Sequence, residues 1–86
     1  MRLDKFLKVS RVIKRRTLAK EVCDRGQITL NGRMAKAGSE VKPGDKLEIN
    51  FGTRRITLEI LLVLPNVPAK EAATMYIILE DIRLES

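Results

Sequence analysis

The sequence predicts an α+β fold in which two short N-terminal helices pack on a small twisted antiparallel sheet, with a short C-terminal helix. Three observations predict this fold. Apolar residues recur at helical spacing near the N-terminus, the period changes to two after Gly26, and turn signals then divide the chain into short strands. A chain of 86 residues is expected to form one domain with a modest core.

An apolar stripe at helical spacing predicts the first helix, from Leu3 to Val9. The stripe consists of Leu3, Phe6, Leu7 and, beyond the helix, Ile13. Thr17 is a suitable N-cap for a second helix, and Gly26 suits the position just after its end. The buried face of this second helix is expected to comprise Leu18, Ala19, Val22 and Cys23.

The chain after Gly26 predicts β-strands joined by tight turns. Gln27 to Leu30 alternates between polar and apolar residues, and Asn31-Gly32 is a strong hairpin signal. Lys42-Pro43-Gly44-Asp45 and Gly52-Thr53 predict two further turns. Three further strands are expected. One begins with Arg33 and Met34, the next runs from Lys46 to Phe51, and the last runs from Arg55 to Leu64, with Ile56, Leu58 and Ile60 on one face.

The segment after Pro65 to Pro68 allows two interpretations. Five apolar residues at helical spacing predict a C-terminal helix: Ala72, Met75, Tyr76, Leu79 and Ile82. The β-branched pair Ile77-Ile78 makes a strand the alternative. The expected organisation is a domain over residues 1–64, followed by a loop and helix extension over residues 65–86.

The positive charge of the chain lies in its first 25 residues. The net charge is +6, and residues 1–25 hold nine basic and three acidic side chains, whereas residues 26–86 hold eight of each sign. A one-signed segment on an otherwise neutral domain repels itself unless a polyanion neutralises it. Phosphate backbones bind such a patch by releasing counterions, which predicts a nucleic-acid partner.

The basic segment has three other interpretations. Most charge runs are solvated helix faces, but those faces usually mix signs. An acidic membrane surface favours bulky apolar anchors opposite the charges, and here the apolar positions are expected in a core. An acidic protein is the third possible partner, which would make the chain a protein-interaction adaptor.

The composition argues against an enzyme or a metal site. The chain has no histidine and one cysteine, Cys23, which we expect to be a buried apolar residue. The aromatic residues are too scattered to stack bases, and Phe6 and Phe51 are expected in the core. We therefore expect binding of structured RNA through charge and shape, without a cofactor or a metal. The apolar runs are too short to cross a bilayer and the N-terminus does not resemble a secretory signal, so a cytoplasmic location is expected.

Four blocks of the sequence together resemble the S4 domain, an RNA-binding module with an αL motif. They cover roughly residues 1–52 in the order and with the short spacings of that family. The blocks are Arg2-Leu3-Asp4-Lys5-Phe6-Leu7, Lys14-Arg15-Arg16-Thr17-Leu18-Ala19, Ile28-Thr29-Leu30-Asn31-Gly32 and Val41-Lys42-Pro43-Gly44-Asp45.

The resemblance implies a role on the ribosome. Stand-alone S4 proteins include the heat-shock protein that binds stalled large subunits and the RqcP-type quality-control family, to which Met1–Glu21 and Glu71–Tyr76 are similar. Such a protein would bind large-subunit ribosomal RNA and a tRNA, the peptidyl-tRNA, on an obstructed large ribosomal subunit. It would also support the factor that adds C-terminal alanine tails. S4 domains are also appended to RNA-modifying enzymes, an alternative that the chain length opposes.

The resemblance also selects residues for RNA contacts. Arg2 and Arg16 match the motif and are the first choices, and Asp4 is expected to orient Arg2 or an adjacent arginine. A plain hairpin turn is the alternative role for Asn31. The further RNA contacts expected are Lys5, Arg11, Lys14, Arg15, Lys20 and Asn31.

Overall fold

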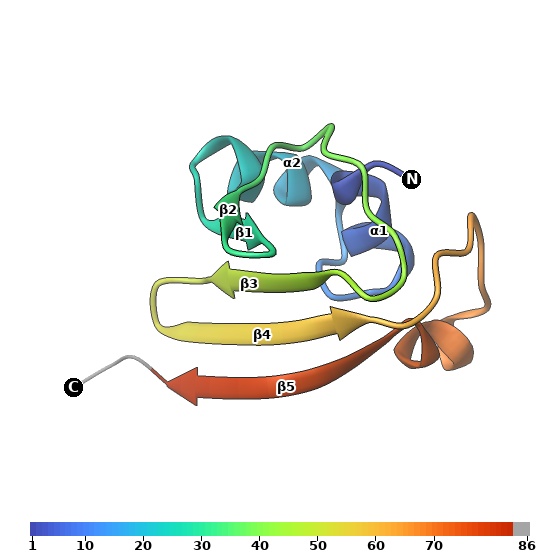
Figure 1. The fold of residues 1–86 in the computed structure, drawn as a ribbon. Helices are drawn as coiled ribbons and strands as arrows, with labels where there is room; N and C mark the ends of the chain where they lie inside the picture. The colour runs from blue at the N-terminus through green and yellow to red at the C-terminus, as the bar shows by residue number, and fades with distance from the viewer. Residues whose placement is uncertain (84–86) are drawn as a thin grey trace.

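The computed structural model describes residues 1–83, in which two N-terminal helices lie against a five-stranded antiparallel sheet (Figure 1). The strand order is β2-β1-β3-β4-β5. In chain order the elements are α1 (Leu3–Val9), α2 (Arg16–Asp24), β1 (Ile28–Leu30), β2 (Arg33–Met34), β3 (Lys46–Asn50), β4 (Arg54–Ile60), the 3₁₀ helix η1 (Ala69–Met75) and β5 (Tyr76–Arg83). The predicted α+β fold is confirmed.

The bounds of α1 match the prediction, whereas α2 begins one residue before Thr17. Its N-cap is Arg15, whose backbone is extended and whose side chain makes no capping hydrogen bond, so the prediction of Thr17 as the cap is wrong. The other end of α2 is as expected. Gly26 has a φ of 72°, and the N–H groups of Gly26 and Gln27 donate to carbonyls of the last helical turn, an αL-type end that glycine adopts without steric cost.

The three predicted turns are present. Asn31 and Gly32 have φ values of 52° and 85°, which joins β1 to β2 in the hairpin geometry that matches strand twist. Asp45 N–H donates to the carbonyl of Lys42 at 3.2 Å and closes the second turn. Phe51 N–H donates to the carbonyl of Arg54 across the third turn, between β3 and β4.

The core lies between the helices and one face of the sheet. Pairing of Ile28 with Ile49 and of Leu47 with Leu58 puts the apolar residues of β1, β3 and β4 on the same face. Phe6 of α1 is fully buried against this face, as predicted. Two predictions about the core are wrong. Leu18 is 45% exposed because it lies off the stripe of α2, and Phe51 is 37% exposed because it follows the end of β3.

The C-terminal segment is helical only at its start. Residues 69–75 form η1, and residues 76–83 form β5, which pairs with β4. The helix predicted through Ile82 is therefore wrong beyond Met75, and the strand alternative is correct for the rest. The strand predicted over Arg55 to Leu64 stops at Ile60, because the N–H of Leu61 donates to the carbonyl of Met75 as the chain turns away. Within residues 1–83, no helix has the length and apolar character needed to cross a membrane.

Candidate nucleic-acid interface

A buried carboxylate, Asp4, joins two arginines that come from different helices. The side chain of Asp4 is only 4% exposed. Nε of Arg2, at the N-cap of α1, donates to Oδ1 at 3.2 Å, and Nε of Arg16, the first residue of α2, donates to Oδ2 at 3.3 Å. The prediction that Asp4 orients Arg2 or an adjacent arginine agrees with this geometry for both residues.

The charge of Asp4 is stabilised by these partners. Burial alone would raise the pKa of the carboxyl group, but the hydrogen bond and charge of Arg16, the N–H of Lys5 and the charge of Arg2 together outweigh burial. The pKa is therefore lowered from 3.8, and Asp4 is ionised at neutral pH. An ionised Asp4 therefore holds both guanidinium groups together by charge-assisted hydrogen bonds.

Both guanidinium groups keep hydrogen-bond donors for a ligand. About half of each side chain is exposed, 54% for Arg2 and 50% for Arg16. A guanidinium has five N–H donors in a planar fork. Asp4 accepts from Nε and Nη2 of Arg2 and from Nε of Arg16, so most donors of each fork have no partner within the described part of the chain. Free forks of this kind bind phosphate oxygens in pairs.

The other basic residues selected from the sequence lie on α1, on α2 and on the connector between them. Lys5 is half-buried on α1, and Lys20 is exposed on α2. The connector between the helices carries the rest, which are all exposed: Arg11, Lys14 and Arg15. The α1–connector–α2 segment thus presents the basic residues of the N-terminal region, as the sequence predicts, while its apolar side enters the core.

Arg11 has a backbone conformation that arginine seldom adopts. It follows the C-cap of α1 with a φ of 66°, in the left-handed region, and its N–H donates to the carbonyl of Lys8. This conformation costs a residue with a Cβ on the order of 1 kcal/mol, and glycine avoids the cost. Arg11 therefore lowers the stability of the fold, and its guanidinium lies exposed in the connector.

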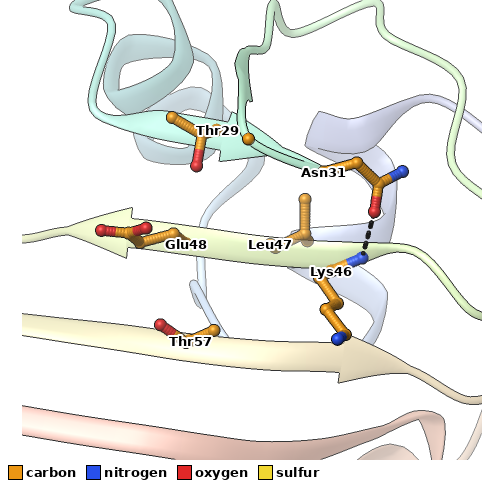
Figure 2. Close-up of a pocket in the computed structure, with 7 residues that line it drawn as sticks. Thr29, Asn31, Lys46, Leu47, Glu48 and Thr57 are labelled. Carbon is orange, nitrogen blue, oxygen red and sulfur yellow. Dashed lines mark hydrogen bonds between the residues drawn. The ribbon is translucent and has the colours of Figure 1, made fainter.

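Most of the side-chain polar groups of Asn31 form hydrogen bonds within the protein. Its Oδ1 accepts from the N–H of Lys46 at 2.9 Å, a bond drawn in Figure 2, and its Nδ2 donates to Oδ1 of Asp45 at 3.0 Å. Asp45 is buried and also accepts from the N–H of Lys42. The side chain of Asn31 thus ties the β1–β2 turn to the start of β3, and at most one side-chain N–H remains for RNA.

Asp45 is a structural residue, although the sequence indicates only that it lies in a turn. Burial would raise the pKa of its carboxyl group, but hydrogen bonds from Asn31 and Lys42 lower the pKa below 3.8 overall. The spacing of the Asn-Gly and Lys-Pro-Gly-Asp turns in the sequence does not reveal that the two turns meet. Only the pairing of β1 with β3 brings them together.

No cluster suited to metal binding is present in residues 1–83. No group of three histidine, cysteine or acidic residues there could hold a metal ion. Cys23 is buried, and burial together with the charges of Asp4 and Asp24 raises the pKa of its thiol from 9.0 to about 11. A thiol with such a pKa is a poor nucleophile at neutral pH.

Comparison with protein families matches residues 1–47 to the S4 domain. The RQC P-site tRNA stabilizing factor of Halalkalibacterium halodurans is 63% identical over 76 residues, which cover 88% of this chain and 86% of that protein. The chain belongs to the S4 domain family. The RQC P-site tRNA stabilizing factor of Bacillus subtilis is 56% identical to this S4 protein over 84 residues, which cover 98% of each chain.

A solved S4-type structure has the same fold. The structure of Vibrio cholerae Heat Shock Protein 15, described as trimeric, superposes with a TM-score of 0.83 at 30% identity. The match covers 91% of this chain and 80% of that one. The resemblance to the S4 domain family and to its ribosome quality-control members, predicted from the sequence, is confirmed.

Proposed function

We propose that this S4 protein binds large-subunit ribosomal RNA and the peptidyl-tRNA in the P site of obstructed large ribosomal subunits, in the cytoplasm and without catalysing a reaction. By holding the tRNA, it supports the quality-control factor that adds C-terminal alanine tails to the stalled chain. The observation that carries the proposal is the pair of arginines that Asp4 presents at the surface. The names of the relatives, P-site tRNA stabilizing factors, support the choice of RNA.

The geometry favours a backbone-reading mode. Arg2 and Arg16 meet at one carboxylate although they are 14 residues apart, so two phosphate-binding forks are fixed at a short separation. Structured RNA presents rows of phosphates at fixed spacing, which such a pair can engage without reading bases. The proposed contacts around the pair are Lys5, Arg11, Lys14, Arg15, Lys20 and the remaining N–H of Asn31.

Replacing Arg16 with alanine tests the RNA-binding part. Losing a hydrogen-bonded charge contact should weaken binding to isolated large subunits by about tenfold or more. Arg25→Ala is the matched control, because Arg25 is an exposed arginine at the other end of α2 whose partner is Glu21. Co-sedimentation measures binding. Equal binding by the two folded variants would contradict the assignment of Arg16.

The salt dependence of binding tests the electrostatic mode. With about five phosphate contacts, log affinity should fall with log salt at a slope of roughly −3.5 to −4.5. A flat response would exclude phosphate contacts as the main source of affinity. Alanine-tail length on stalled large subunits with and without the protein tests the supporting role. Tails that are unchanged despite binding would favour a general structured-RNA adaptor.

A further inference from the structure

A turn from the middle of the chain completes the N-terminus of α1. The carbonyls of Ala37 and Ser39 accept from the N–H groups of Asp4 and Leu3 at 3.1 and 2.8 Å. These N–H groups lie in the first turn of a helix, where no intrahelical acceptor exists, and the N-cap Arg2 offers no side-chain cap. The residues 36–39 turn therefore takes the place of a capping side chain.

Hydrogen bonds within the 36–39 turn and in the residues after it fix its conformation. Lys36 N–H donates to Oγ of Ser39 and Ser39 N–H donates to the carbonyl of Lys36, each at 2.9 Å. The residues that follow run antiparallel to the N-terminus, with a bridge between Arg2 and Glu40 and a bond from Val41 N–H to the carbonyl of Met1. The position of the turn relative to Arg2 is thus fixed by backbone hydrogen bonds.

Gly38 lies at the exposed side of this turn, beside the guanidinium of Arg2. A Cβ on Gly38 would lie 3.8 Å from Nη2 of Arg2, an ordinary van der Waals distance. Unlike the other four glycines, Gly38 does not have a positive φ. The backbone and the packing would therefore both accept a residue with a side chain, so neither of them accounts for glycine at this position.

We propose that Gly38 keeps the flank of the Arg2 guanidinium open, so that the 36–39 turn forms a third wall of the RNA-binding surface beside α1 and α2. A phosphate that accepts from the free donors of Arg2 must approach within about 3 Å of its nitrogens. A side chain that extends from position 38 would occupy space next to Nη2, which keeps one N–H besides the one that it donates to Asp4. The bare turn instead lets a ribose–phosphate backbone approach the protein main chain closely. This inference rests on the proposed function.

The test is a graded series at position 38, Gly38→Ala and Gly38→Leu, assayed with isolated large ribosomal subunits. The alanine variant should bind with little change, and the leucine variant about tenfold more weakly, the loss expected for one charge-assisted hydrogen bond. Both should unfold at the temperature of the unmodified protein. Ala73→Leu is the matched control, because Ala73 is an exposed residue of η1 and the change adds the same bulk to the surface.

The double variant Arg2→Ala, Gly38→Leu connects the effect to Arg2. Because the contact is already lost in Arg2→Ala, leucine at position 38 should reduce binding little further in that background. Wild-type binding by folded Gly38→Leu would overturn the inference, and so would an equal tenfold loss in the Arg2→Ala background. If Gly38→Leu fails to fold, Gly38→Ser and Gly38→Val replace it in both backgrounds. Full binding by Arg16→Ala would instead contradict the arginine pair on which the proposed function rests.

Discussion

Replacing Asp4 with asparagine separates the position of the arginines from their charge. The substitution keeps the size of the side chain but removes the negative charge that Arg2 and Arg16 share. It also raises the net charge by one from +6. If RNA binding depends only on total charge, affinity should rise. If it depends on the orientation that Asp4 imposes, affinity should fall, so the two explanations predict opposite signs.

The size of the effect on stability follows from the exposure of the partners. Each hydrogen bond to a buried charge contributes about 1.5–3 kcal/mol, but half-exposed partners are screened and contribute about 0.5–1 kcal/mol each. The two ion pairs, with shortest N–O distances of 3.2 and 3.3 Å, therefore contribute about 1–2 kcal/mol together. For a chain of this length, such a loss lowers the melting temperature by about 4–16 °C.

The assay compares Asp4→Asn with Asp24→Asn below their melting temperatures, using isolated large subunits. Asp24 is exposed at the last position of α2, so its replacement changes the charge equally without touching either arginine. We expect Asp4→Asn to bind about tenfold more weakly, and Asp24→Asn to bind at least as tightly as the unmodified protein. Tighter binding by a folded Asp4→Asn variant would refute the role of Asp4 as a positioning residue.

Four other perturbations have defined outcomes. Arg11→Gly should raise the free energy of unfolding by about 1 kcal/mol, because glycine adopts the left-handed backbone without strain, and it should weaken RNA binding. Denaturant melts measure the stability and co-sedimentation measures the binding. A lower free energy of unfolding would contradict the strain argument. Asn31→Ala should lower the free energy of unfolding by about 1–3 kcal/mol, because Asp45 loses a hydrogen-bond partner, with little change in the RNA affinity of the folded protein. A large loss of affinity would instead assign Asn31 to the interface. The pKa values of Asp4 and Asp45 are lower in the folded state, so on acidification the unfolded state takes up protons on these groups first. The free energy of unfolding should therefore hold above about pH 4 and fall below it. Acid titration followed by circular dichroism checks this. The raised pKa of Cys23, about 11, should lower stability between pH 9 and 11 by about 1.4 kcal/mol per pH unit, a slope that Cys23→Ala removes.

The sequence predicts those elements whose signal is local. The stripe around Phe6 defines α1, and the Asn31-Gly32 dipeptide defines the hairpin, because both depend on neighbours in the chain. β5 lacks such a signal. It is an edge strand whose residues are mostly exposed on both faces, so Tyr76–Arg83 shows no clear period of two, and apolar spacing suggests a helix instead.

The candidate site shows the same division. The basic residues can be found from the charge distribution, and Asp4 from its place in the motif. The structural role of Asp45 and the proposed role of Gly38 depend on segments that are far apart in the sequence but close in space: Asn31 bonds to Asp45, and Gly38 lies beside Arg2. A single sequence carries no local sign of such contacts.

The attachment of the 36–39 turn to α1 couples RNA binding to folding. The bond from Leu3 N–H to the carbonyl of Ser39 closes a long loop, and Arg2 lies at the point of closure. The proposed binding surface therefore exists only when the two segments are docked, and an undocked or unfolded chain does not present it. In the proposed binding mode, RNA stabilises the folded state. At an RNA concentration of 100 times Kd, the native state gains about 2.7 kcal/mol, and the N-terminal segment becomes harder to release from the fold.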